Sequence, residues 1–283
     1  MYYLGCDLGS TTGKVVILKQ EGDEVKWVSD AIEPSGLSPV ETAEAAVSRA
    51  LERGGLTRAD LAGTCATGYG RENVTWADKN MSEISCHARG AHSLHEGCRT
   101  IIDVGGQDVK AISVTGSGKV ADFTMNDKCA AGTGRFFEAM ALTLRVSVEE
   151  LGELALQGSD PVPISSTCSV FAESEVVTAI NKGLDRADIA AGIHESIARR
   201  LVGMVNRVGL AEDVLLTGGC AKNPALRQAL EGMLGVEVKM LPCDPQLNGG
   251  LGAALFACAG EQSAVLVKGQ PAPAAACCEG CRS

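Results

Sequence analysis

Two cysteines stand where the sequence predicts the start of a helix, and both lie downstream of a glycine-rich turn. Cys129 precedes the segment Ala130–Phe136, and Cys168 follows Ser165-Ser166-Thr167. A helix N-terminus carries a partial positive charge and exposed N–H groups, which favour a thiolate over a thiol. Thiolates are the ligands that metal ions and iron–sulfur clusters need. The two segments therefore indicate a metal or redox centre.

A second motif occurs twice, as an apolar strand followed by an Asp–x–Gly turn and a lysine. Asp7, Gly9 and Lys14 have the same spacing as Asp103, Gly105 and Lys110. Turns rich in Gly, Ser and Thr let backbone N–H and hydroxyl groups reach phosphate oxygens. An aspartate at the end of each strand can hold hydrated Mg²⁺ between the two turns, because Mg²⁺ retains waters and takes few carboxylates. No G-x-x-x-x-G-K-[ST] sequence occurs, so this is not a Walker loop.

The elements that must position these motifs alternate between strands and helices, which indicates an α/β protein. Strands are predicted near residues 2–7, 14–20, 61–67, 99–104, 108–115, 119–125, 213–217 and 236–240. Helices are predicted near residues 38–53, 82–95, 133–145, 147–157, 169–182, 186–208, 222–233 and 246–258. The repeated turn motif predicts two similar domains, with a helical insertion at about 129–208 in the second.

The length of 283 residues fits two domains of ordinary size. We expect a first domain over 1–97 and a second over 98–260, whose last helix could pack back on the first. Residues 261–283 are expected to form a flexible Pro/Ala/Cys tail that ends near Cys277, Cys278 and Cys281. The sequence does not indicate a role for these three thiols.

Composition excludes several classes of protein. The net charge of −10 and an aromatic content of 4% argue against nucleic-acid binding. Because no run of about 18 apolar residues occurs, no transmembrane helix is expected. The N-terminal segment has no basic and apolar targeting pattern, so a cytoplasmic location and reduced thiols are expected for the 12 cysteines. Most other cysteines are interpreted as small buried hydrophobes, and the four histidines as isolated surface or capping residues.

Five segments in order give the sequence a specific resemblance. These are the Asp7 turn, the Asp103 turn, the Cys129 segment, the Cys168 segment and Thr217–Asn223. Together they resemble the actin, hexokinase and heat-shock ATPase superfamily. Within it they resemble the activators of 2-hydroxyacyl-CoA dehydratases, with the ATP-binding subunits of benzoyl-CoA reductases as close relatives. The resemblance implies two duplicated actin/hexokinase-like (ribonuclease H-like) domains.

The resemblance also implies roles for individual residues. Asp7 and Asp103 would anchor Mg²⁺ through water, and Gln107 could orient the attacking water as a third catalytic residue. The residues that would bind ATP or ADP are Gly9, Ser10, Thr11, Thr12, Lys14, Gly105, Gly106, Gln107, Gly132, Thr133, Gly134, Gly218, Gly219 and Asn223. Cys129 and Cys168 would each supply one thiolate to a [4Fe–4S] cluster shared across a homodimer. Two cysteines per chain are half of the four that such a cluster needs.

The function implied by the resemblance is ATP-dependent injection of a low-potential electron into a CoA-thioester dehydratase or reductase. A ferredoxin or flavodoxin would supply that electron. Three alternatives remain open: an ATP-binding subunit of a benzoyl-CoA-type reductase, a small-molecule kinase of the same superfamily, and a nucleotide sensor without turnover. The acyl-CoA substrate, the partner enzyme and the electron donor are not indicated by the sequence.

Overall fold

The structure is a computed structural model, which describes residues 1–126, 128–258 and 265–266. The chain forms two compact units, which we call unit 1 and unit 2. Unit 1 comprises residues 1–96 together with the described residues from 241 onward, and unit 2 comprises residues 97–240. The predicted tail lies outside the described residues apart from 265–266, and so do Cys277, Cys278 and Cys281.

Unit 1 is built on a mixed sheet with the strand order β11-β3-β2-β1-β4-β5. Its strands are β1 (Tyr2–Leu8), β2 (Thr12–Glu21), β3 (Glu24–Pro34), β4 (Leu61–Thr67), β5 (Lys79–Asn80) and β11 (Val265–Leu266). Successive side chains of a strand point to opposite faces of the sheet. Accordingly, Leu4 and Cys6 pack in one core with Ala46 of α1 (Pro39–Gly54), whereas Tyr3 packs in another with Leu251 of α8 (Asn248–Ala257).

Small residues bring α8 against the centre of this sheet. A Cβ atom at Gly5 would lie 2.1 Å from the carbonyl oxygen of Gly250, so only glycine at position 5 permits this approach. The helix α2 (Glu83–Leu94) packs against α8 in turn, and Gly252 fits directly over the backbone of Cys86. The glycines of α8 and β1 therefore permit close packing on both sides of α8.

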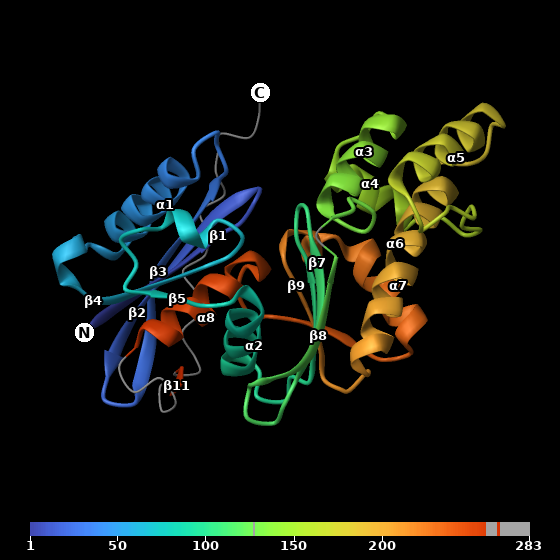
Figure 1. Cartoon of the computed structure of the whole chain (residues 1–283). Helices are drawn as coiled ribbons and strands as arrows, with labels where there is room; N and C mark the ends of the chain where they lie inside the picture. Colours follow the sequence, from blue (N-terminus) through green and yellow to red (C-terminus); the bar gives the residue numbers. More distant parts are fainter. Residues whose placement is uncertain (127, 259–264, 267–283) are drawn as a thin grey trace. The chain divides into compact units, whose positions relative to one another are not determined.

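Unit 2 is built on a second mixed sheet, with the strand order β10-β9-β6-β7-β8. Its strands are β6 (Thr100–Val104), β7 (Val109–Val114), β8 (Val120–Asn126), β9 (Val214–Thr217) and β10 (Val238–Met240). Its helices are α3 (Gly134–Leu144), α4 (Val148–Ala155), α5 (Ser169–Asn181), α6 (Arg186–Val208) and α7 (Pro224–Leu234). Their apolar faces and one face of the sheet share a single core. Within unit 2, Figure 1 shows α3, α4 and α5 grouped at one end of the sheet.

All eight predicted helices and all eight predicted strands are confirmed, with shifts of a few residues at their ends. The prediction omitted β3, β5 and β11. The pattern of β3 is hidden by Ser29 and Asp30, two polar residues that are buried in the middle of the strand. Ser29 donates to the carbonyl of Ala50 at 2.7 Å, and Asp30 accepts from Trp27 Nε1 at 2.9 Å. Burial raises the pKa of Asp30.

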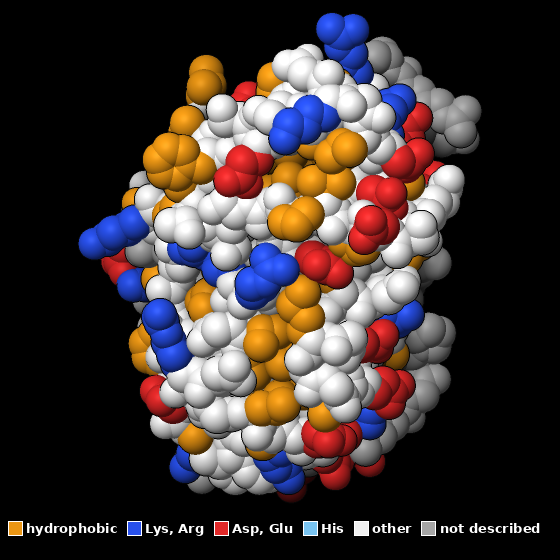
Figure 2. All heavy atoms as spheres, turned by 90° about the vertical axis from the view of Figure 1, so that its right-hand side faces the viewer, with side chains coloured by type: hydrophobic (Ala, Val, Ile, Leu, Met, Phe, Trp, Pro, Cys, Tyr) orange, Lys and Arg blue, Asp and Glu red, His pale blue; other side chains and the backbone are white. Residues whose placement is uncertain are grey.

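Four short 3₁₀ turns complete the described structure: η1 (Arg58–Asp60), η2 (Arg71–Asn73), η3 (Gly219–Lys222) and η4 (Pro245–Leu247). Among the described residues, no helix combines the length and the apolar character needed to cross a membrane. Figure 2 faces the right-hand side of Figure 1, and there hydrophobic side chains lie exposed among charged ones. Exposed apolar residues of α5 include Val170 and Phe171, which follow Cys168 directly.

Candidate functional site

The first Asp–Gly turn joins β1 to β2 in unit 1. The N–H of Gly9 donates to the carbonyl of Thr12 at 3.0 Å, which closes a four-residue turn. Asp7, the last residue but one of β1, is buried, and its Oδ2 pairs with Lys14 Nζ at 3.2 Å. Ser10 is exposed at the tip of the turn, and Thr11 is half-buried. The predicted residues of this motif therefore lie together, with the polar groups of the turn accessible.

The second turn, between β6 and β7 in unit 2, has the same construction. The N–H of Gly105 donates to the carbonyl of Asp108 at 2.9 Å. The fully buried Lys110 pairs with Asp103 Oδ2 at 3.3 Å and with Asp108 Oδ1 at 2.9 Å. Gln107 is exposed at the tip of the turn, beside the half-buried Gly106. The repeat identified in the sequence is therefore a repeat of three-dimensional structure.

Each aspartate also has a threonine opposite it that the sequence analysis did not select. Asp7 is paired in register with Thr67 on β4, and Asp103 is paired with Thr217 on β9. A glycine with positive φ follows each threonine, Gly68 at 89° and Gly218 at 85°. Each threonine ends a predicted strand and is followed by glycine, but the dipeptide Thr-Gly also occurs at 12–13, 115–116 and 133–134, so the sequence alone did not single out these two.

The two aspartates nevertheless have different surroundings. Asp103 Oδ1 accepts a hydrogen bond from Thr217 Oγ1 at 2.8 Å. Thr67 donates instead to the carbonyl of Met81, and Asp7 Oδ1 is buried without a hydrogen-bond partner among the described residues. A Cβ atom at Gly68 would lie 2.5 Å from that oxygen, so any larger residue at position 68 would crowd it. A buried carboxylate oxygen of this kind fits a water molecule of hydrated Mg²⁺.

In unit 2, the second turn is hydrogen-bonded to the segment that contains Cys129. The N–H groups of Gly134 and Arg135 donate to the carbonyls of Gly105 and Gly106, both at 2.9 Å. Thr133 is fully buried, and its Oγ1 donates to the carbonyl of Ala130 at 2.7 Å. These bonds join the turn to the residue that directly follows Cys129.

Cys129 itself does not start a helix, so that expectation was wrong. It lies in irregular backbone before α3, and Asn126 Nδ2 donates to its carbonyl at 2.9 Å. Gly132, which lies between Cys129 and α3, has a φ of 90° that is incompatible with a right-handed helix. Cys168, in contrast, is the N-cap residue of α5, as expected.

Cys129 and Cys168 are half-buried, as are Cys220 and Cys243, while the other described cysteines are buried. Burial raises the thiol pKa of Cys6, Cys86, Cys98, Cys220, Cys243 and Cys258. A thiol that burial keeps protonated is a poor metal ligand. The donor chemistry of Cys129 and Cys168 fits a thiolate-bound cluster, and two thiolates are half of a four-iron set.

The segment Thr217–Asn223 places Gly218 and Gly219 between β9 and α7, as predicted. Asn223 caps α7, because its Oδ1 accepts from the N–H groups of Ala225 and Leu226. Its Nδ2 lies 2.9 Å from His194 Nε2, while His194 Nδ1 lies 2.8 Å from the carbonyl of Ala190. Since that carbonyl can only accept, the proton is on Nδ1, and Nε2 accepts from Asn223. Burial lowers the pKa of His194 to about 4.

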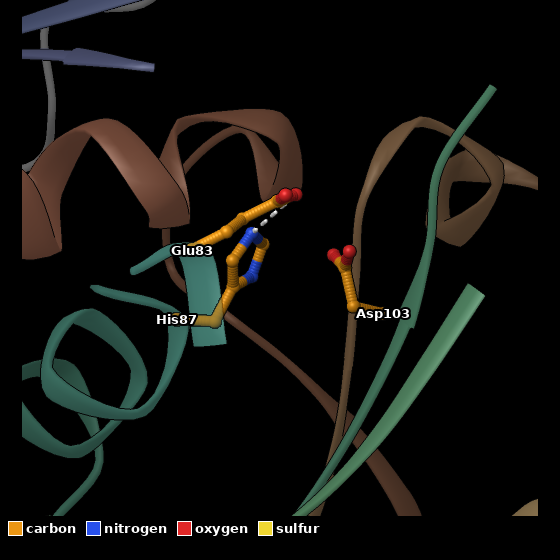
Figure 3. A group of neighbouring side chains, drawn as sticks. All are labelled: Glu83, His87 and Asp103. Carbon is orange, nitrogen blue, oxygen red and sulfur yellow. Dashed lines mark ion pairs between the residues drawn. The ribbon is translucent and has the colours of Figure 1, made fainter. Parts of the chain in front are cut away.

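The interpretation of the histidines as isolated surface or capping residues was wrong for His87 and His194, which are both buried. Figure 3 shows Glu83 and His87 one turn apart on α2, with His87 Nε2 at 3.8 Å from Glu83 Oε1. Asn248 Nδ2 lies 3.1 Å from the carbonyl of His87 and 3.2 Å from its Nδ1. His87 thus fastens α2 to the start of α8 within unit 1.

Comparison with known proteins places these features in a family. The chain is 50% identical over 259 residues to the (R)-2-hydroxyglutaryl-CoA dehydratase activating ATPase of Acidaminococcus fermentans, covering 91% of this chain and 97% of that protein. It is 48% identical to the activator of lactoyl-CoA dehydratase of Anaerotignum propionicum, covering 91% and 97%.

Among solved structures, the activator of the 2-hydroxyisocaproyl-CoA dehydratase from Clostridium difficile with bound ADPNP is similar. It has a TM-score of 0.83 and 42% identity, and the match covers 91% of this chain and 94% of that chain. The expected α/β fold with duplicated actin/hexokinase-like domains is confirmed. Residues 4–257 match one family model, and the chain belongs to the BadF/BadG/BcrA/BcrD ATPase family.

Proposed function

We propose that this chain is an ATPase that activates a 2-hydroxyacyl-CoA dehydratase, or a related CoA-thioester enzyme, by passing it a low-potential electron. The observation that carries the proposal is the hydrogen-bonded connection in unit 2 between the Gly105-Gly106 turn and the Cys129 segment. A turn suited to phosphate is thereby hydrogen-bonded to the backbone that follows a thiol suited to a redox centre. The similarity to dehydratase activators supports the same function.

Each unit contributes one phosphate-binding turn in this proposal. Backbone N–H groups and the hydroxyls of Ser10, Thr11 and Thr12 bind phosphate in unit 1, and Gly105, Gly106 and Gln107 do so in unit 2. Lys14 and Lys110 hold the carboxylates of Asp7 and Asp103 in place. Asp7, whose Oδ1 has no hydrogen-bond partner among the described residues, would hold hydrated Mg²⁺ together with Asp103, and the exposed Gln107 would orient the attacking water. Gly132, Thr133, Gly134, Gly218, Gly219 and Asn223 complete the nucleotide site.

Cys129 and Cys168 would hold the [4Fe–4S] cluster, which supplies a centre for one-electron transfer when it is bound. Because each chain offers two such thiols, two chains would share one cluster in a homodimer. The exposed Val170 and Phe171 beside Cys168 support an interface there, since burial of large apolar side chains favours association. The donor would be a ferredoxin or a flavodoxin in the cytoplasm.

Coupling would follow from the short path between the turn and the thiol. A phosphate that displaces Gly105 or Gly106 also displaces Gly134 and Arg135, because their N–H groups are bonded to the turn. Thr133 passes that displacement to Ala130, the neighbour of Cys129. Small changes in ligand position, burial and hydrogen bonding alter the potential of an iron–sulfur centre.

The test is reconstitution with purified dehydratases for 2-hydroxyglutaryl-CoA and for lactoyl-CoA, under anaerobic conditions with a reduced ferredoxin. We expect dehydration of one of these substrates to start when ATP is added and not when ADP is added. Hydrolysis of ATP without activation of any CoA-thioester enzyme, and without oxidation of the ferredoxin, would contradict the proposal.

A further inference from the structure

One side chain of unit 2, Arg200 on α6, contacts both cysteine segments. Its Nη1 donates to the carbonyl of Ser166 at 3.2 Å, two residues before Cys168. Its Cδ lies 3.1 Å from the position that a Cβ atom at Gly132 would occupy, three residues after Cys129. The aliphatic stem therefore packs beside one segment, and the guanidinium group is bonded to the other.

We propose that Arg200 is a positioning residue that keeps the Cys129 segment and the Cys168 segment at a fixed spacing. The inference rests on the proposed function in one respect, namely that both cysteines bind the same cluster. The contacts of Arg200 themselves are independent of any bound group. A single side chain that joins both ligand segments makes them move together.

The helix α6, which carries Arg200, is held in place by core packing and by an N-cap. Its neighbours Ile197 and Leu201 are buried in the core of unit 2, and Asp185 caps the start of α6 by accepting from the N–H of Ala187 at 2.7 Å. The stem of Arg200 thus begins at a fixed point. A planar guanidinium group gives directional hydrogen bonds, so it fixes the Ser166 carbonyl more closely than a lysine would.

The segments that Arg200 joins have additional restraints of their own. The N–H of Ser165 donates to Glu175 Oε2 on α5 at 2.6 Å, and Thr133 holds Ala130. Gly132 has a φ of 90°, and the close approach of the Arg200 stem leaves little room for a side chain there. Each restraint acts within one segment, whereas Arg200 acts on both.

Arg199 provides a matched control on the same helix. It is exposed and pairs with Glu195 at 3.7 Å, one turn earlier. Arg199→Met removes the same charge and the same number of donors as Arg200→Met, while both changes keep an unbranched stem. Arg200→Lys keeps the charge and most of the stem but loses the planar group.

The experiment is hydrogen–deuterium exchange on the full chain purified without iron, read at residues 130–135 and 165–168. Arg200→Met loses the charged hydrogen bond to Ser166, and its stem is then no longer held in one direction beside Gly132, so exchange is expected to rise in both segments by about tenfold. Arg200→Lys should show a smaller increase in both, and Arg199→Met should match the unmodified chain. Unchanged exchange along the rest of α6 shows that the variant is folded. An increase in neither segment, or in only one, would overturn the proposal.

A second readout separates this inference from the proposed function. After reconstitution with iron and sulfide, Arg200→Met should shift the reduction potential of the bound cluster or retain less iron than Arg199→Met, with Arg200→Lys between them. If the unmodified chain takes up no iron, the proposed function fails, while the exchange measurement still decides the role of Arg200. If iron content and potential are identical in all variants, Arg200 does not position the ligands.

Discussion

Asp103 and Thr217 lie opposite each other on neighbouring strands, and the threonine hydroxyl donates to the carboxylate at 2.8 Å. Lys110 holds the other carboxylate oxygen. In unit 1, Thr67 has the corresponding place beside Asp7, but its hydroxyl donates to a backbone carbonyl. The duplication has therefore kept the residue types and changed the hydrogen bonds. Both carboxylate oxygens of Asp103 are bonded within the protein, whereas Asp7 Oδ1 has no hydrogen-bond partner among the described residues.

This difference predicts unequal effects of the same substitution. Thr217→Val leaves a buried carboxylate without its hydroxyl donor, and should lower the free energy of unfolding by about 2 kcal/mol. Thr67→Val loses a bond between uncharged groups, and should lower it by about 1 kcal/mol. Urea denaturation of both variants measures the two losses. Equal losses would show that the hydrogen bond to Asp103 contributes no more to the free energy of unfolding than the hydrogen bond made by Thr67.

The glycine after Thr217 is required by the backbone. A Cβ atom at Gly218 would lie 2.4 Å from the carbonyl oxygen of Val104, and φ is 85°. Gly218→Ala should therefore destabilise the protein by at least about 3 kcal/mol. Gly232 lies inside α7 with nothing within 4 Å of its Cβ position, so Gly232→Ala should stabilise by about 1 kcal/mol. Thermal unfolding of the pair tests this, and a stable Gly218→Ala protein would be inconsistent with the observed turn.

The assignment of Cys129 and Cys168 as cluster ligands predicts which thiols are needed for iron retention. Cys129→Ser and Cys168→Ser should each abolish iron retention and activation of the partner enzyme, while nucleotide binding remains. Cys243→Ser serves as the control, because that thiol is in unit 1 and burial raises its pKa to about 12. Iron analysis and nucleotide titration measure both properties. Normal iron content in Cys168→Ser would exclude that residue as a ligand.

The buried His194 predicts a pH dependence of stability. Its pKa in the folded protein, about 4, lies below its ordinary value of 6.5, so the unfolded chain binds a proton that the folded chain excludes. The free energy of unfolding should therefore fall as the pH is lowered from about 6.5 towards 4, by at most about 1.4 kcal/mol per pH unit. Denaturation of His194→Gln should lack this contribution, whereas the control His95→Gln should keep it. An identical pH profile for His194→Gln would refute it.

Both Asp–x–Gly turns could be predicted from the sequence because each is defined by local spacing. The turn and its lysine lie within eight residues, and the hydrogen bond donated by Gly9 or Gly105 closes each turn internally. The strand β3 could not be recognised, because Ser29 and Asp30 interrupt its apolar alternation. Ser29 is satisfied by the distant carbonyl of Ala50, and Asp30 by Trp27 of the same strand.

The remaining site residues depend on contacts that no local pattern reveals. Thr217 reaches Asp103 across 114 residues of sequence, and Arg200 reaches Ser166 across 34. His194 has no ligand-like spacing, and its role follows only from the packing of α6 against the start of α7. No local sequence motif marks these residues, so their contacts with the motifs are seen only in the three-dimensional structure.

The most direct test of the central claim is the content of iron and acid-labile sulfide per chain in anaerobically purified protein, combined with its native mass. We expect about two irons per chain in a dimer, which corresponds to one four-iron cluster shared by two pairs of Cys129 and Cys168. A stable protein that binds ATP but contains no iron, and takes up none on reconstitution, would contradict the redox function. That result would favour a small-molecule kinase or a nucleotide sensor.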